Sequence, residues 1–175
     1  VGSHAIEALA RCGVGRLVLV DNDTVSLTNI NRQSIAMHST IGRPKTQVMK
    51  EKIADLSPDT RVITSEQFVL PQNLDTLFET IKSQMEPSDR VSYILDAIDT
   101  VTAKLALVSY AQENGIPIIS SMGTGNKLHP ELFSISDISQ TSVCPLCRVM
   151  RKELKARNIS HLKVCWSPEP PLTPG

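Results

Sequence analysis

A glycine and an aspartate near the start of the chain have the spacing expected of a nucleotide-binding site. Gly2 opens an apolar-periodic segment, and Asp21 follows directly on the apolar run 17–20. The 19 residues from Gly2 to Asp21 are close to the roughly 20 that separate a phosphate-binding glycine turn from the acid that binds ribose hydroxyls. The two residues therefore predict phosphate and ribose contacts, respectively. The competing interpretations are a glycine that only precedes a helix and an Asp21 that only caps a turn.

The residues after Asp21 favour ATP as a reactant. Asp23 comes next, and further polar side chains then crowd into five positions, namely Asn29, Asn31, Arg32 and Gln33. An Arg guanidinium binds two phosphate oxygens at once and stabilises charge that develops during transfer. Lys45 stands at the start of a predicted helix, where a cation is disfavoured unless an anion lies nearby. A solvated loop with an incidental Arg is the competing interpretation.

Two further carboxylates, Asp96 and Asp99, lie three residues apart at the end of a predicted strand. A Mg²⁺ ion that accompanies ATP is commonly held by one or two carboxylates together with phosphate oxygens and water. Asp99 is therefore a candidate Mg²⁺ ligand, and Asp96 is a second. Asp99 as the cap of the helix that starts near Val101 is the alternative, and both roles can coexist. The loop at Gly123 is expected to flank the substrate.

Hydrophobic periodicity predicts alternating strands and helices along the chain. Strands are expected at 16–20, 59–70 (with part of a loop), 92–98, 116–121 and 132–138. Helices are expected around Ile6, Leu9 and Ala10, from near Pro44, at 71–83 and at 101–114. This order is typical of an α/β fold with a doubly wound, mostly parallel, Rossmann-like sheet, in which ligands bind beyond the carboxyl ends of the strands. We expect one ATP-binding domain over residues 1–175.

The composition narrows the class of protein. The chain starts inside a motif without Met and ends on a proline-rich tail, so we expect it to be the ordered part of a longer polypeptide. No apolar run approaches the roughly 20 residues of a membrane span. Four cysteines in 175 residues do not make a disulfide framework, which favours a reduced, cytoplasmic location.

The joint pattern of these motifs resembles the ThiF/MoeB/HesA superfamily, the bacterial relatives of ubiquitin-activating enzymes. The resemblance runs from Val1 to about Ile135 and rests on five pieces: Gly2-Ser3, Asp21-Asn22-Asp23, the 29–33 segment, Gly42-x-Pro44-Lys45 and Asp96-x-x-Asp99. It implies an enzyme that uses ATP to adenylylate a carboxylate and releases pyrophosphate. The segment before Val1 should supply the rest of the glycine turn.

Roles for individual residues are implied by motif position within that superfamily. Asp21 would hold the ribose, Arg32 and Lys45 the phosphates, and Asp99 the Mg²⁺, which makes Arg32, Lys45 and Asp99 the catalytic set. The nucleotide-binding set implied by the same resemblance is Gly2, Asp21, Asp23, Asn29, Arg32, Gln33, Lys45 and Asp99. Relatives are usually dimers whose partner subunit contributes an Arg to the ATP site, so a homodimer is expected.

Within the superfamily, three stretches look most like the branch that dehydrates threonylcarbamoyladenosine in tRNA. They are the Asp96–Asp99 segment, the Gly123 loop and the tail 167–171. That branch implies ATP-dependent activation of the threonyl carboxylate, followed by cyclisation and loss of AMP. The rival is an adenylyltransferase that activates a ubiquitin-like sulfur carrier, with a sulfur-transfer protein as partner. A plain dinucleotide-binding oxidoreductase and a scaffold without turnover are further alternatives, and Arg32 and Lys45 argue against the oxidoreductase.

The cysteines bear on the choice between branches. Sulfur-carrier activators commonly hold zinc with two Cys-x-x-Cys pairs, whereas this chain has the single pair Cys144 and Cys147, with Cys165 as a third thiol. Because two or three thiolates do not complete a tetrahedral site, zinc is not expected within this chain; a fourth ligand from residues beyond it is the alternative. Cys144 and Cys147 are interpreted as ordinary thiols at a helix start. Cys12 is interpreted as a small core residue on the first helix.

A basic segment supports a tRNA substrate. Residues 143–165 carry a net charge of +5 in a chain with 18 basic and 18 acidic residues. If Pro145 opens a helix, its cationic residues share one face: Arg148, Arg151, Lys152 and Lys155. The opposite face would hold Leu146, Val149, Met150 and Leu154. A cationic stripe suits a phosphate backbone, with a merely solvated face as the alternative. Trp166 is the one aromatic side chain near this helix to test for base stacking.

Overall fold

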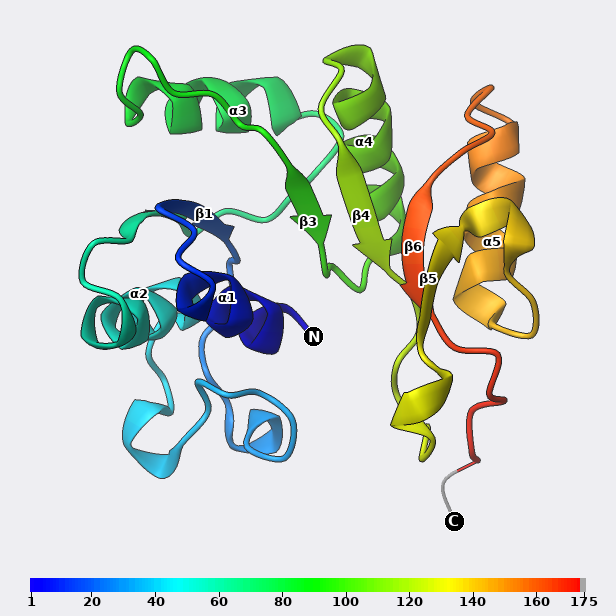
Figure 1. Cartoon of the computed structure of the whole chain (residues 1–175), viewed down its shortest axis with the longest axis horizontal. Helices are drawn as coiled ribbons and strands as arrows, with labels where there is room; N and C mark the ends of the chain where they lie inside the picture. Colours follow the sequence, from blue (N-terminus) through cyan, green and yellow to red (C-terminus); the bar gives the residue numbers. More distant parts are fainter. Residues whose placement is uncertain (174–175) are drawn as a thin grey trace. The chain divides into compact units, whose positions relative to one another are not determined.

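The structure of the protein is a computed structural model, and it describes residues 1–173. Contacts divide the chain into two compact units, Val1–Arg90 and the part from Val91 onward, and each unit has its own hydrophobic core. Figure 1 labels the elements of both. The expectation of one ATP-binding domain stays a prediction.

The first unit is built from a parallel strand pair and the helices that follow each strand. Helix α1 (Gly2–Arg11) ends before Gly13, whose φ of +79° needs a glycine. Strand β1 (Arg16–Val20) pairs in parallel with β2 (Arg61–Ser65). Helix α2 (Lys45–Leu56) contacts both β2 and α1, and helix α3 (Leu74–Ser83) follows β2. The unit's main core draws Leu19, Val48, Met49 and Ile53 from β1 and α2.

The second unit is a four-stranded sheet in the order β3-β4-β6-β5, as Figure 1 shows. Strands β3 (Ile94–Asp96), β4 (Ile118–Ser121) and β6 (Lys163–Trp166) are parallel, and β5 (Ser134–Asp137) runs antiparallel at one edge. Helix α4 (Val101–Glu113) packs on β3 and β4, and helix α5 (Pro145–Lys155) contacts α4. The expected α/β class with mostly parallel strands is therefore what the structure has.

Several local expectations were wrong. Strand β6 was not predicted, because its residues lie in a segment that was interpreted only by its charge. Its Trp166 is buried, and the indole N–H donates to Ser136 Oγ at 2.9 Å, so the ring is not a stacking platform. Cys12 is exposed, since it follows the last turn of α1 instead of lying on the packed face. Val149 of α5 is also exposed, and the buried stripe there consists of Cys147, Met150 and Leu154.

None of the helices within residues 1–173 combines the length and the apolar character that crossing a membrane requires.

Candidate functional site

Pairing between two loop segments fixes the polar turn that follows β1. Thr24 forms a bridge with Pro44, the Val25 N–H donates to the Arg43 carbonyl at 2.9 Å, and the Gly42 N–H donates to the Val25 carbonyl at 2.8 Å. This short antiparallel pairing brings the first residue of α2 against the carboxyl end of β1. The position of Lys45 is therefore set by backbone hydrogen bonds as well as by its side chain.

The charged groups of this turn bind one another. Lys45 Nζ donates to Asp23 Oδ2 at 2.7 Å, and the Lys45 backbone N–H donates to the Asp23 carbonyl at 3.0 Å. Asp21 Oδ1 accepts the Asp23 N–H at 2.8 Å, and the Asp21 N–H donates to the last residue of β2, Ser65, at 3.1 Å. Three of the predicted nucleotide-binding residues are thus brought together: Asp21, Asp23 and Lys45.

The predicted 29–33 segment contains one turn-forming residue and one exposed cation. Asn29 is buried, and its Oδ1 accepts the Ser26 N–H at 3.0 Å in a capping box. Its carbonyl accepts the N–H groups of Arg32 and Gln33. Asn29 therefore shapes the loop, and its contact with a ligand stays a prediction. The Arg32 guanidinium is exposed and donates to the Thr28 carbonyl at 2.7 Å and to Asn31 Oδ1 at 3.1 Å.

Helix α1 begins at Gly2, the residue that the sequence assigns to phosphates. Its N-cap, Val1, makes no side-chain capping bond. The amide groups of a first helical turn, together with the helix dipole, favour an anion.

The two aspartates of the second unit have different surroundings, which the sequence could not distinguish. Asp96, the last residue of β3, is 1% exposed and forms an ion pair with Lys104 Nζ at 3.0 Å. It also accepts hydrogen bonds from the Ser120 hydroxyl and from the Ile98 N–H. Asp99 is exposed, and its Oδ1 accepts from the Thr100 hydroxyl at 3.3 Å. Asp99 does not cap α4, whose N-cap is Thr100.

Sequence reasoning missed Lys104, which is fully buried. Its ammonium also donates to Ser120 Oγ at 3.2 Å and to the Ser121 carbonyl at 2.8 Å, so all three of its donors have acceptors. A signal was present, because Lys104 precedes Val108 and Ala111 by four and seven residues and so lies on the buried stripe of α4. The cluster joins the carboxyl ends of β3 and β4 to α4.

Cys144 and Cys147 differ from each other, although they were interpreted as two ordinary thiols. Both are buried, and Cys144 is the N-cap of α5. Burial raises the pKa of the Cys144 thiol, but hydrogen bonds from the backbone N–H groups of Cys147 and Gly123 and from the Cys147 side chain lower it by more. Burial and the hydrogen bond to Cys144 raise the pKa of Cys147 to about 12. The Gly123 loop is thus tied to the start of α5.

Within residues 1–173, no three or more His, Cys, Asp or Glu side chains are grouped to hold a metal ion. The expectation against zinc stays a prediction. Asp99 is one exposed carboxylate, which fits Mg²⁺ only with the phosphate oxygens and waters that this ion usually retains.

The predicted cationic face of α5 is largely present. Arg148, Lys152 and Lys155 are exposed. Arg151 is half-buried, because its guanidinium donates to the Thr141 carbonyl at 2.9 Å and to the Thr141 hydroxyl.

Glu169, in the tail 167–171, binds the backbone of the loop that follows Gly123, a role that the sequence did not predict for it. The Glu169 carboxylate accepts the backbone N–H groups of Leu128 and His129 at 2.8 and 3.1 Å. These bonds hold the pKa of Glu169 below its ordinary value. The tail is thereby attached to the loop that follows Gly123.

Comparison with known proteins identifies the family. The ThiF family model matches residues 1–162, and the chain therefore belongs to the ThiF family. It is similar to tRNA threonylcarbamoyladenosine dehydratase of Bacillus subtilis, with 41% identity over 173 residues, 98% of this chain and 65% of that protein. It is 38% identical to the protein of the same name in Escherichia coli, over 89% of this chain and 55% of that protein. The chain thus spans less than two thirds of the length of these curated relatives.

The solved structures agree with the family assignment. The E. coli dehydratase TcdA in complex with ATP matches 100% of this chain and 72% of its own, with a TM-score of 0.88 and 34% identity. This likeness confirms the expected ThiF/MoeB-type α/β fold.

Proposed function

We propose that this protein uses ATP to dehydrate threonylcarbamoyladenosine in tRNA. The observation that carries the proposal is the turn at the end of β1, where backbone pairing positions Lys45, the Lys45 ammonium donates to Asp23, and the Asp23 N–H donates to Asp21. The turn occurs in a chain 41% identical to a named dehydratase and 34% identical to a structure named as its ATP complex.

The proposed reaction has two steps. An oxygen of the threonyl carboxylate attacks the α-phosphorus of ATP, the bond to the β-phosphate breaks, and pyrophosphate leaves. The neighbouring carbamoyl group then attacks the activated acyl carbon, the bond to AMP breaks, and a proton is released. The nucleoside loses one water in total, and ATP becomes AMP and pyrophosphate. Neither step needs a thioester on the enzyme.

Residues of the first unit supply the proposed nucleotide contacts. Asp21 accepts from the ribose hydroxyls, and Gly2 lets the first turn of α1 approach the phosphates. Lys45 leaves Asp23 for a phosphate oxygen, and Arg32 exchanges its carbonyl and amide partners for phosphate oxygens, which bind a guanidinium more strongly. Asn29 and Gln33 are assigned to the same ligand on family resemblance.

Asp99 is the proposed Mg²⁺ ligand in the second unit, because it is exposed while Asp96 is committed to Lys104. Bound Mg²⁺ would neutralise charge on the departing pyrophosphate.

The exposed cations of α5 are the proposed tRNA contact. Arg148, Lys152 and Lys155 would meet backbone phosphates, and Arg151 supports the same face through Thr141. Each lost phosphate contact should reduce the salt dependence of tRNA binding by roughly one unit of slope. A homodimer and a sulfur-transfer partner stay predictions. We place the reaction in the cytoplasm because the named relatives act on tRNA.

The test is to incubate the full-length protein with ATP, Mg²⁺ and tRNA that carries threonylcarbamoyladenosine, and to analyse the nucleosides by mass spectrometry. ATP-dependent loss of one water from the modified adenosine is the expected result. An unchanged nucleoside, with pyrophosphate released only when a ubiquitin-like carrier protein is added, would contradict the proposal and favour the sulfur-carrier branch.

A further inference from the structure

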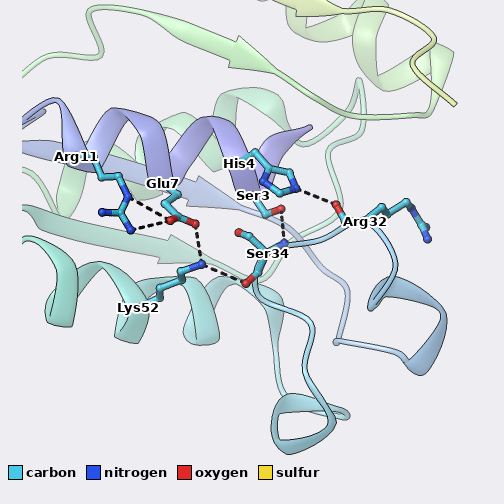
Figure 2. Close-up of polar contacts among 7 residues, drawn as sticks. All are labelled: Ser3, His4, Glu7, Arg11, Arg32, Ser34 and Lys52. Carbon is cyan, nitrogen blue, oxygen red and sulfur yellow. Dashed lines mark hydrogen bonds and ion pairs between the residues drawn. The ribbon is translucent and has the colours of Figure 1, made fainter. Parts of the chain in front are cut away.

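The backbone of the loop that carries Arg32 is bound by a cluster of side chains from the two neighbouring helices. Figure 2 shows this cluster: Ser3, His4, Glu7 and Arg11 come from α1, Arg32 and Ser34 from the loop, and Lys52 from α2. All of these residues belong to the first unit, and sequence reasoning assigned only Arg32 among them.

Lys52 joins three elements through one ammonium group. Its Nζ donates to Glu7 Oε2 at 2.7 Å and to the Ser34 carbonyl at 3.1 Å. The Lys52 side chain is 32% exposed and that of Glu7 is 21% exposed, so water reaches the pair only in part. The hydrogen bond from Lys52, followed by the one from Arg11, lowers the pKa of Glu7 to about 2. Glu7 is therefore ionised near neutral pH.

Two further contacts bind the same stretch of backbone to the first turn of α1. The Ser34 N–H donates to Ser3 Oγ at 3.1 Å, and a ring nitrogen of His4 lies 3.1 Å from the Arg32 carbonyl. Both polar backbone groups of Ser34 and the carbonyl of Arg32 are thus held by the helices. Ser3 and His4 come immediately after Gly2, so the loop is attached to the turn that we assign to phosphates.

The contacts of the Arg32 guanidinium differ from those of the Arg32 backbone. In Figure 2 the side chain extends away from His4. It is exposed, and its partners, Thr28 and Asn31, come from its own loop. The residue is therefore fixed at its backbone, while its charged end rests on exposed acceptors that an anion can replace.

We infer that Lys52, together with Glu7, is a positioning residue that holds the Arg32 loop against the first turn of α1, so that the guanidinium and that turn bind the same polyphosphate. This inference rests on the proposed use of ATP. Because the Lys52–Glu7 pair is partly open to water, its contribution to folding is expected to be small, and the effect is expected in the placement of the loop more than in stability. A displacement of about 1 Å in a positioned group can cost on the order of a hundredfold in rate.

Arg11 provides a matched control. It donates to Glu7 Oε1 at 3.0 and 3.2 Å, as Lys52 donates to Oε2, but it lies on the same helix as Glu7 and is four residues away. Losing Arg11 removes an ion pair with the same carboxylate and leaves the connection to the Ser34 carbonyl intact.

The experiment compares Lys52→Met with Arg11→Met in the full-length protein. Hydrogen exchange of residues 28–36 and ATP affinity by calorimetry are measured, with urea unfolding as the stability reference. We expect Lys52→Met to speed exchange in this loop and to raise the Kd for ATP about tenfold, which corresponds to about 1.4 kcal/mol. Arg11→Met should leave both unchanged. Loop exchange and ATP affinity that stay at wild-type values in Lys52→Met would overturn the inference.

A double substitution tests whether Lys52 acts through Arg32. In an Arg32→Ala background, Lys52→Met should have little further effect on ATP affinity, because coupled residues are not additive. Full additivity would contradict the inference. If Lys52→Met does not fold, Glu7→Gln with the same measurements decides, because it keeps the acceptor and removes the charge.

The two measurements also distinguish a failure of this inference from a failure of the proposed function. If the wild-type protein does not bind ATP, the proposed function fails, and loop exchange alone still decides whether Lys52 holds the loop.

Discussion

The two units each hold a lysine–aspartate ion pair near the end of a parallel strand, but the pairs differ in burial. In the first unit, Lys45 and Asp23 are 2.7 Å apart, and their side chains are 12% and 59% exposed, so water reaches this pair from the Asp23 side. In the second, Lys104 and Asp96 are 3.0 Å apart, and both side chains are 0% exposed. Residue type and spacing are therefore not enough to assign a role, because the same kind of pair is open to water in one unit and enclosed in the other.

Breaking the two pairs should have very different effects on the free energy of unfolding. A pair whose carboxylate is open to water contributes about 0–1 kcal/mol, so we expect Lys45 to leave Asp23 for a phosphate at little cost. A buried pair must satisfy every donor and acceptor, since a charge left alone in the interior costs several kcal/mol. Lys104 meets that condition with Asp96, Ser120 and Ser121 as its acceptors.

The largest expected effect is on stability, from Lys104→Met. The substitution leaves the Asp96 carboxylate buried without its cation, which should cost about 3–5 kcal/mol. Urea unfolding should show the loss as a lower midpoint at an unchanged slope. Asp96→Asn in the same background should recover part of the loss. A Lys104→Met protein within about 1 kcal/mol of wild type would show that burial does not distinguish the two ion pairs.

The next effect is on turnover, from Arg32→Ala and Asp99→Ala. Removal of one group that stabilises transition-state charge costs on the order of 10²–10³ in rate. ATP consumption should therefore be lost in both variants, while the unfolding curve stays that of wild type. Retained turnover in either variant would refute that site assignment.

A smaller effect is expected from Lys45→Met, the counterpart of Lys104→Met. A charge-assisted hydrogen bond contributes about 1.5–3 kcal/mol, so the Kd for ATP should rise roughly tenfold or more. The free energy of unfolding should change by less than about 1 kcal/mol. Calorimetry with ATP measures the first quantity and urea unfolding the second. A large loss of stability here would remove the distinction between the two pairs.

The smallest effect is on the pH dependence of stability, through Glu7. Because its pKa is lowered from 4.5 to about 2 in the folded protein, its stabilising contribution is fully present above about pH 4.5. The contribution is lost as the pH falls through about 2. The free energy of unfolding should therefore fall less steeply between pH 4.5 and 2 in Glu7→Gln than in wild type. Identical slopes would show that Glu7 is not bound as described.

The sequence predicted elements well where apolar spacing was unambiguous. The strand predicted at 16–20 has the same bounds in the structure. The predicted bounds of α4 and the predicted start of α2 agree with the structure to within one residue. Strand β6 was missed because its alternation is short and begins with Lys163. The different surroundings of Asp96 and Asp99 could not be predicted, because both follow the same predicted strand and only the fold shows which of them is buried.

Local hydrogen bonding accounts for the rest of what was missed. Lys52 and Glu7 meet across 45 residues of sequence, and no periodicity links them. Burial raises the pKa of Cys144, but hydrogen bonds lower it by more, and most of these come from backbone N–H groups. Backbone donors have no signature in residue type.

ATP calorimetry on Arg32→Ala, with urea unfolding of the same preparation, tests most directly whether the Arg32 guanidinium binds the nucleotide. We expect ATP affinity to fall at least tenfold while the free energy of unfolding stays within about 1 kcal/mol of wild type. Unchanged ATP affinity in Arg32→Ala would contradict the proposal that the exposed Arg32 guanidinium binds the nucleotide.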